Sequence, residues 1–173
     1  DLAAEALQYL QQIQARRKVD PMVVGAVLPL TGRQSAVAYK TLRGLQLGLG
    51  VAGRSTTNIK LAVIDSEGNP DTARRGVERL VVEDSVVGIV GDLLSRTAET
   101  VSHKSEELGV PNISLSQRSG LTQIGSYIFR NALTSEAQVE ELVRAAMDGQ
   151  GLRRFAILYP NDPYGVEYAN LFW

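Results

Sequence analysis

The sequence contains no cysteine, and this absence excludes disulfide bonds, thiolate nucleophiles and thiolate metal ligands together. It contains a single histidine, His103, which stands among polar residues of an expected helix without the neighbours that a metal ligand or a general base needs. We therefore expect a solvated histidine, and neither a structural zinc site nor a Ser–His–Asp triad. No apolar run approaches the roughly 20 residues that a membrane-spanning helix requires.

An excess of charge of either sign is also absent. The 18 basic and 19 acidic side chains give a formal net charge of −1, so nothing in the charge favours nucleic acid or an anionic membrane as a partner. Hydrophobic residues make up 44% and charged residues 21% of the 173 residues, as in an ordinary globular protein. Residues 1–18 have the pattern of an amphipathic charged helix and not of a signal peptide. A mature exported protein would look the same.

The sequence does have a regular alternation of short apolar runs and amphipathic stretches. The runs predict strands at 22–28, 59–64, 86–91, 112–115, 127–130 and 155–159. The stretches between them predict helices at 39–51, from 71, at 95–108, at 135–150 and from about 166. This alternation predicts an α/β protein with a doubly wound parallel sheet. We expect a leading helix over 1–21, a first α/β lobe over 22–150, and over 151–173 the start of a second, similar lobe that continues in a longer protein.

The stretch from Gly88 to Ser119 brings two polar loops to one edge of this sheet. The strands expected at 86–91 and 112–115 are joined by one helix, and such a unit requires parallel strands and a right-handed crossover. The loops that follow them therefore meet at the carboxyl edge, where open α/β sheets bind ligands. Ser95 stands at the expected N-cap of the helix. Its hydroxyl can simply satisfy the helix's own N–H groups, or the positive helix end can bind a ligand carboxylate.

Other residues near this edge favour a binding site. Ser116 and Arg118 face Ser95 from the next strand, and Arg118 together with Arg96 and Arg33 indicates a pocket that tolerates or prefers negative charge. Tyr164 lies in a DPYG turn, where it is either a turn residue at a lobe interface or an aromatic wall for a ligand. The sequence is consistent with both interpretations of Tyr164.

Two features of the sequence resemble functional sites but predict neither dinucleotide binding nor catalysis. Residues 48–53 spell GxGxxG, but they end a helix instead of opening one after a strand, so we interpret them as a helix end and linker. Asp65, Glu67 and Asp92 lie near strand ends without the defined pairing that acid–base catalysis needs. We expect Asp65 and Asn69 to satisfy backbone groups of a turn and a helix cap. An enzyme is the weakest interpretation, because no nucleophile–base pair is visible.

The order of these segments resembles the type I periplasmic binding protein superfamily, in its leucine/isoleucine/valine-binding branch. The matching pieces are VGAVLPLTG (24–32), RGLQLGL (43–49), AVIDSEGNP (62–70), VVGIVGDLLS (86–95), LGVPNISLSQRSGLT (108–122), YIFRNALTSEAQ (127–138) and FAILYPNDPYG (155–165). The resemblance implies a non-catalytic, extracytoplasmic receptor that holds an amino acid or similar small carboxylate between two lobes and feeds the permease of an ABC-type transporter. It assigns ligand contacts to Ser95, Ser116, Arg118 and Tyr164.

Two departures from that branch leave an alternative open. Amino-acid binders usually carry a threonine where this chain has Arg118, and a cation there favours a further acidic group over an ammonium. The leading helix and the LPLTGR opening also resemble the outer-membrane lipoprotein activators of penicillin-binding proteins. Those proteins use the same fold to contact a peptidoglycan synthase and would carry a lipid anchor ahead of Asp1. Either resemblance implies a periplasmic or other extracytoplasmic location, with no cofactor and no metal.

Overall fold

The computed structural model describes residues 6–7, 9–10, 19–53, 57–161 and 163–173. The chain divides into two compact units, the first made of residues 1–116 and 120–131 and the second of residues 117–119 and 132–173. Most of the helix expected over 2–18 lies outside the described residues, and the described residues within it, 6, 7, 9 and 10, are helical. None of the described helices is long and apolar enough to cross a membrane.

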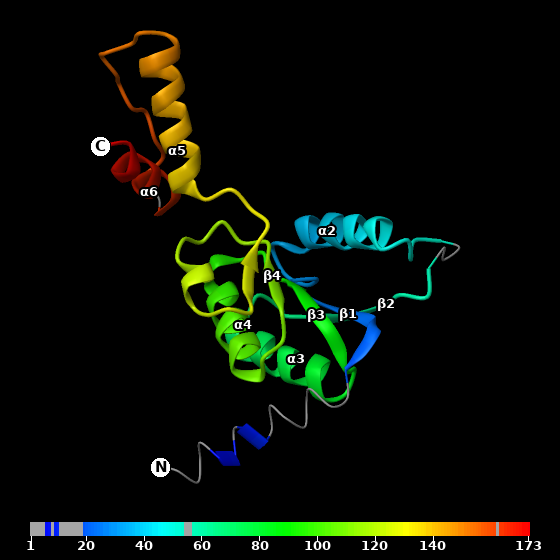
Figure 1. The fold of residues 1–173 in the computed structure, drawn as a ribbon. Helices are drawn as coiled ribbons and strands as arrows, with labels where there is room; N and C mark the ends of the chain where they lie inside the picture. Colours follow the sequence, from blue (N-terminus) through cyan, green and yellow to red (C-terminus); the bar gives the residue numbers. More distant parts are fainter. Residues whose placement is uncertain (1–5, 8, 11–18, 54–56, 162) are drawn as a thin grey trace. The chain divides into compact units, whose positions relative to one another are not determined.

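The first unit is built on a five-stranded parallel sheet (Figure 1). Its strands are β1 (Asp20–Leu28), β2 (Lys60–Asp65), β3 (Val86–Gly91), β4 (Asn112–Ser114) and β5 (Ile128–Arg130). Their spatial order, β2-β1-β3-β4-β5, confirms the predicted doubly wound α/β class. The order changes direction between β1 and β3, which makes the gap between these two strands the topological switch point of the sheet.

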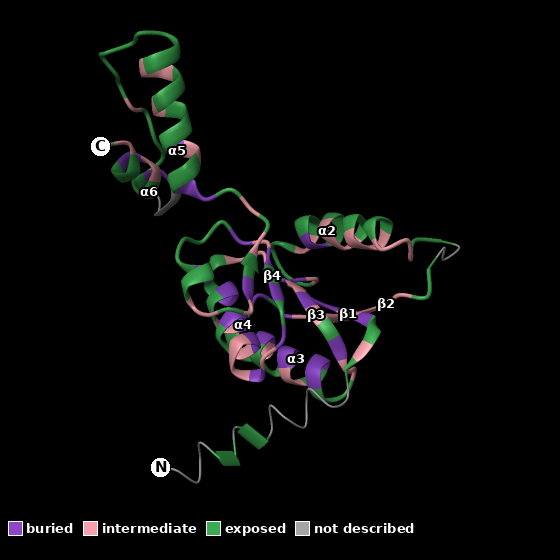
Figure 2. Cartoon of the chain, in the orientation of Figure 1, coloured by how far each residue is buried: buried purple, intermediate pink, exposed green. Residues whose placement is uncertain are grey.

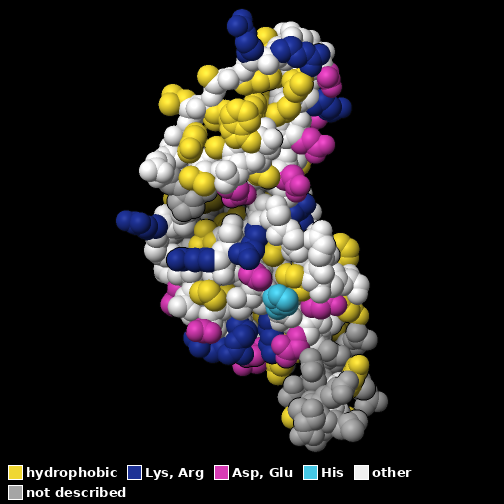
Figure 3. Space-filling view, turned by 90° about the vertical axis from the view of Figure 1, so that its left-hand side faces the viewer, with side chains coloured by type: hydrophobic (Ala, Val, Ile, Leu, Met, Phe, Trp, Pro, Cys, Tyr) yellow, Lys and Arg dark blue, Asp and Glu magenta, His cyan; other side chains and the backbone are white. Residues whose placement is uncertain are grey.

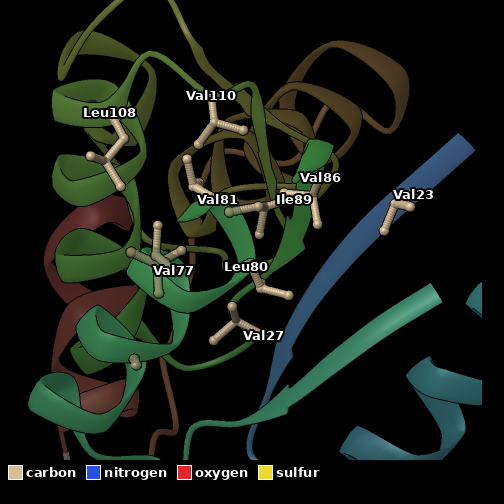
Figure 4. Packing of buried hydrophobic residues seen from close by; sticks show 11 residues of the cluster. Val23, Val27, Val77, Leu80, Val81, Val86, Ile89, Leu108 and Val110 are labelled. Atoms are coloured by element: carbon tan, nitrogen blue, oxygen red, sulfur yellow. The ribbon is translucent and has the colours of Figure 1, made fainter. Parts of the chain in front are cut away.

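Three helices cover the sheet, one on one face and two on the other: α2 (Ser35–Gly48), α3 (Pro70–Val82) and α4 (Ser95–Leu108) (Figure 1). On the first face, Ala38, Leu42 and Leu45 of α2 pack against apolar side chains of β1 and β2. On the other face, α3 and α4 bury a larger cluster, shown in Figure 4, that includes Val23, Val27, Val77, Leu80, Val81, Val86, Ile89, Leu108 and Val110. Figure 2 shows the difference as buried inner faces on α3 and α4 and a largely exposed α2.

On the face that carries α2, part of the sheet is left uncovered. One row of residues crosses all five strands there, in the order Val63, Ala26, Val90, Ile113 and Phe129. Ala26 is fully buried and packs with α2, whereas Ile113 and Phe129 are 41% and 52% exposed. Parallel strands are normally covered on both faces. Among the described residues, therefore, the half-face over β4 and β5 is an exposed apolar surface.

Local sequence signals account for the helix boundaries. The side chain of Asn69 accepts the backbone N–H groups of Asp71 (2.9 Å) and Thr72 (3.1 Å), and α3 starts at the next residue, Pro70. This confirms the predicted cap. At the end of α4, Gly109 adopts the left-handed conformation (φ 66°) that closes many helices. The GxGxxG stretch is a helix end, as predicted, because α2 ends at its first glycine, Gly48. The expected helix at 39–51 starts earlier, at Ser35.

The second unit contains α5 (Ser135–Arg144), a π-helical turn η2 (Ala145–Gly149) and α6 (Pro163–Phe172). The strand expected over 155–159 is wrong, since these residues have no regular structure. A strand needs a neighbour to pair with its N–H and C=O groups, and the described residues of this unit form no strand. The ring of Phe155 packs edge-to-face on Phe172 instead, with 5.3 Å between ring centroids.

Apolar side chains are widely exposed in this second unit. Figure 3 shows them over its surface, and they include Leu133, Leu142, Leu152, Leu158 and Trp173. Contacts assign α5 to this unit, although we expected the first lobe to extend to residue 150. Where the lobes of the whole protein divide stays a prediction.

Candidate functional site

The carboxyl edge of the sheet is the natural place for a ligand. Three of the strands end level with one another, because Leu28 of β1 pairs with Asp65 of β2 and Val27 of β1 pairs with Gly91 of β3. The loops that leave these strands therefore start side by side at the switch point, where ligands of open α/β sheets bind. The loop after β3 leads directly into α4, so the start of α4 belongs to this edge.

Asp65 joins the loops that follow β1 and β2. One oxygen of its carboxylate accepts the backbone N–H groups of Leu30 (2.8 Å), Thr31 (3.4 Å) and Glu67 (2.8 Å). This confirms the structural role predicted for the residue. Partial burial acts to raise the pKa of the Asp65 carboxyl, but these donors and the Thr31 hydroxyl outweigh it, and the pKa lies below its usual value. Asp65 is therefore ionised at neutral pH, and its hydrogen bonds hold the loops after β1 and β2 together at the carboxyl edge.

Asp92 is the first residue of the loop that follows β3, and it is fully buried. Its Oδ1 accepts the backbone N–H groups of Leu93 and of Leu94, the latter at 3.2 Å. Its Oδ2 has no hydrogen-bond partner among the described residues. Burial raises the pKa of the Asp92 carboxyl, and the neighbouring donors, foremost the Thr97 hydroxyl, only partly oppose this.

The prediction that Ser95 is the N-cap of α4 is wrong. The N-cap is Leu94, whose extended backbone (φ −93°, ψ 132°) enters the helix one residue earlier, and whose carbonyl accepts N–H groups of Thr97 (3.1 Å) and Ala98 (2.9 Å). A leucine has no side-chain oxygen, so the N-cap residue itself makes no side-chain cap hydrogen bond. Ser95 is the exposed first residue of a 14-residue helix whose positive end faces the sheet edge.

Arg96 places a cation beside this helix end. A side-chain carbon added to Gly68, in the turn after β2, would lie 2.5 Å from Nη2 of Arg96 and 3.1 Å from Cδ1 of Leu94. The exposed guanidinium therefore rests on the glycine of that turn, whose left-handed backbone (φ 61°) also favours glycine. Leu94 and Arg96 together pack the start of α4 onto the turn after β2.

The other predicted site residues divide between the two units. Ser116 follows β4 at the same sheet edge as Ser95 and Arg96, but it is fully buried, and its N–H donates to Oγ of Ser114 (3.2 Å). Arg118 is exposed and belongs to the second unit, as does Tyr164, which lies in α6. The ligand contacts expected of these two residues stay predictions.

Sequence reasoning missed the character of Asp92, which it noted only among carboxylates near strand ends. A signal was present, because an aspartate that directly continues the apolar run VVGIVG with no basic residue beside it is a candidate for burial. His103 is exposed on α4, as expected. No group of three or more histidine, aspartate or glutamate side chains suited to a metal ion occurs within the described ranges.

Comparison with known proteins identifies the family. A family model described as "Periplasmic binding protein" matches residues 21–172, and the chain therefore belongs to that family. No curated protein sequence is significantly similar to the chain.

Solved structures share the fold. An ABC transporter substrate-binding protein from Sphaerobacter thermophilus superposes with a TM-score of 0.72 at 27% identity, over 88% of this chain and 43% of its own. The branched-chain amino acid transporter substrate-binding protein LivJ from Streptococcus pneumoniae, in complex with isoleucine, gives 0.70 at 19% identity, over 88% and 46%. An ABC transporter solute-binding protein from R. palustris, in complex with 4-hydroxybenzoate, gives 0.65 at 20% identity, over 88% and 42%. The chain thus spans less than half the length of these proteins.

Proposed function

We propose that this protein is a non-catalytic, extracytoplasmic receptor for a small carboxylate and that it delivers this solute to the permease of an ABC-type transporter. The observation that carries the proposal is the start of α4. There, a long helix without a side-chain cap from its N-cap residue opens at the switch point of a parallel sheet, with the Arg96 cation beside it. Helix N-termini of this kind bind anions through backbone N–H groups and the helix dipole.

The relatives support the choice of a carboxylate. Isoleucine, bound in the LivJ structure, and 4-hydroxybenzoate, bound in the R. palustris protein, differ in size, shape and ammonium group but share one carboxylate. At 19% and 20% identity these structures establish the fold of this chain and not its ligand. Both compounds are therefore probes, and Arg96 argues for including dicarboxylates beside them.

Thermal unfolding of the full-length protein against a panel of ligands tests the proposal. The panel contains isoleucine, 4-hydroxybenzoate, glutamate and succinate, with isoleucinamide as the control that lacks a carboxylate. A ligand present at about 100 times its dissociation constant adds about 2.7 kcal/mol to the free energy of unfolding. We expect at least one carboxylate to raise the unfolding midpoint and isoleucinamide to leave it unchanged. If no ligand of the panel raises the unfolding midpoint, the proposal is contradicted. The next experiment is then a pull-down with peptidoglycan synthases.

Substitutions then test where the carboxylate binds. Ser95→Ala and Arg96→Ala change exposed side chains at the start of α4, so we expect weaker binding of the panel ligand with little change in stability. The matched controls are Ser126→Ala and Arg43→Ala, which remove the same exposed groups away from this edge. Equal affinities in all four variants and the parent would exclude the side chains of Ser95 and Arg96 from the site.

A further inference from the structure

The carboxyl group of Asp92 lies next to the start of α4, where the ligand carboxylate is proposed to bind. Asp92 is 0% exposed and is the first residue of the loop that leads into α4. Oδ1 accepts the N–H groups of Leu93 and Leu94, so this oxygen holds in place the residue that caps the helix. The mechanism proposed above makes no use of the second oxygen.

That second oxygen, Oδ2, is buried without a donor in the described part of the chain. The hydroxyl of Thr97 lies close enough to act on the pKa of Asp92, but by geometry its proton is donated to the carbonyl of Leu94 (3.1 Å) and not to Oδ2. Oγ of Ser66, also buried, accepts the N–H of Gly68 (3.4 Å). The Ser66 hydroxyl also acts to lower the pKa of Asp92, but it makes no hydrogen bond of good geometry to Oδ2. An ionised carboxylate with one oxygen unpaired in a buried position is unfavourable, and the protonated acid costs less.

The charged residues on the surrounding elements do not provide a buried partner for Asp92. They are Arg33 in the loop after β1, Asp65 and Glu67 in the turn after β2, and Arg96 and Glu99 on α4. Arg96 and Glu67 are exposed at the rim, Arg96 resting on Gly68, and Asp65 is committed to backbone N–H groups. Burial outweighs the hydrogen-bond donors in setting the pKa of Asp92, which lies above its usual value.

We infer that Asp92 is a positioning residue for the proposed ligand site, and that a carboxylate binds at the start of α4 more tightly when the Asp92 carboxyl is protonated. The inference rests on the proposed function. A protonated Asp92 keeps its Oδ1 contacts to the loop and adds no charge beneath the ligand. An ionised Asp92 places a second negative charge under the same helix end, and like charges at short range disfavour each other. Ligand binding therefore takes up a proton wherever Asp92 is partly ionised.

The pH dependence of stability in the ligand-free protein tests whether folding raises the pKa of the Asp92 carboxyl. Because the pKa of Asp92 is raised by folding, the folded state holds the proton more tightly, and the stability contributed by the protonated acid is lost as pH rises through the folded pKa. Thermal unfolding of the parent and of Asp92→Asn, followed from about pH 4, near the ordinary pKa of an aspartate, up to pH 8, should show the parent losing stability relative to the variant as pH rises. The control is Asp65→Asn, whose difference from the parent should stay constant above about pH 5, since Asp65 is ionised there. A constant difference for Asp92→Asn would overturn the inference.

Calorimetric titration of the full-length protein with isoleucine and with 4-hydroxybenzoate tests the coupling. We expect the affinity of the parent for the probe that binds to fall with rising pH, by up to about tenfold per pH unit above the Asp92 pKa. Proton uptake should appear as a binding heat that depends on the ionisation enthalpy of the buffer. Asp92→Asn should bind with a pH-independent affinity and without proton uptake.

The possible failures of this experiment are distinct. Binding by the parent with no pH dependence and no proton uptake overturns the inference and leaves the proposed function intact. Absence of binding by all four carboxylates of the panel at pH 5 and at pH 8 counts against the proposed function and, with it, against the coupling. If the parent and Asp92→Asn show the same pH dependence, another group carries the proton and Asp92 is only structural.

Discussion

Two aspartates at the same sheet edge show how position decides the chemistry of one side chain. Asp65 is only partly buried and accepts three backbone N–H groups on one oxygen, and its pKa is lowered. Asp92 is fully buried, one of its oxygens has no partner in the described part of the chain, and its pKa is raised. The edge thus combines a fixed negative charge at the rim with a titratable group beneath the helix start.

Asp65 gives a prediction about acid stability. Its folded pKa is depressed, so its contribution is present above the unfolded pKa and is lost as pH falls through the folded value. We expect Asp65→Asn to be less stable than the parent at pH 7, with the difference shrinking as pH falls below about 4. Thermal unfolding midpoints measured between pH 7 and pH 2.5 check this. A difference that grows on acidification would contradict the assigned hydrogen bonds.

At this scale, sequence reasoning succeeded where the chemistry is local. The roles of Asp65 and Asn69 follow from turn and cap preferences that span a few residues. The burial of Ser116 depends on the packing of β4, which no local pattern reveals, whereas the burial of Asp92 had one local signal, the apolar run that it continues. The N-cap assignment failed by one residue, because side-chain preference favours serine while the backbone of Leu94 makes the actual turn.

Among the elements, the contact of α3 with the sheet depends on one glycine. A side-chain carbon on Gly76 would lie 2.6 Å from Cγ2 of Ile64, so helix and strand approach too closely for alanine. Gly44 in α2 is its natural comparison, since a carbon added there meets nothing within 4 Å. The two glycines are both helical, and they differ only in what lies opposite.

We therefore expect opposite effects from the same substitution. Gly76→Ala should destabilise the protein by about 1–3 kcal/mol, because overpacking outweighs the gain in helix propensity. Gly44→Ala should stabilise it by up to about 1 kcal/mol through that propensity alone. Urea unfolding of both variants measures the difference. Stabilisation by both would show that α3 moves freely away from β2.

Element prediction succeeded in the first unit and failed in part of the second. Strand β3 has the bounds that its apolar run predicted, and the order of strands and helices around it is as expected. The apolar run at 155–159 did not become a strand, although its composition is that of one. Strand formation depends on a paired neighbour, which composition alone does not reveal.

Across the described residues, two of the exposed apolar surfaces bear on the architecture of the whole protein. One is the half-face of the sheet over β4 and β5, with Ile113 and Phe129, and the other is the surface of the second unit, with Leu133 and Leu142. The solved structures of the fold are more than twice as long as the part that this chain matches. The start of α4 and the loops around it all belong to the first unit, where the proposed carboxylate site lies.

The most direct test of the account is to locate the bound carboxylate by amide NMR of the full-length protein. Isoleucine or 4-hydroxybenzoate, whichever binds, is titrated while the backbone resonances at both ends of the sheet are followed. We predict saturable shifts at Leu94, Ser95 and Arg96, with Lys60 and Val86 at the opposite edge unaffected. Saturable shifts confined to other residues, or none at saturating ligand, would contradict a carboxylate site at the start of α4.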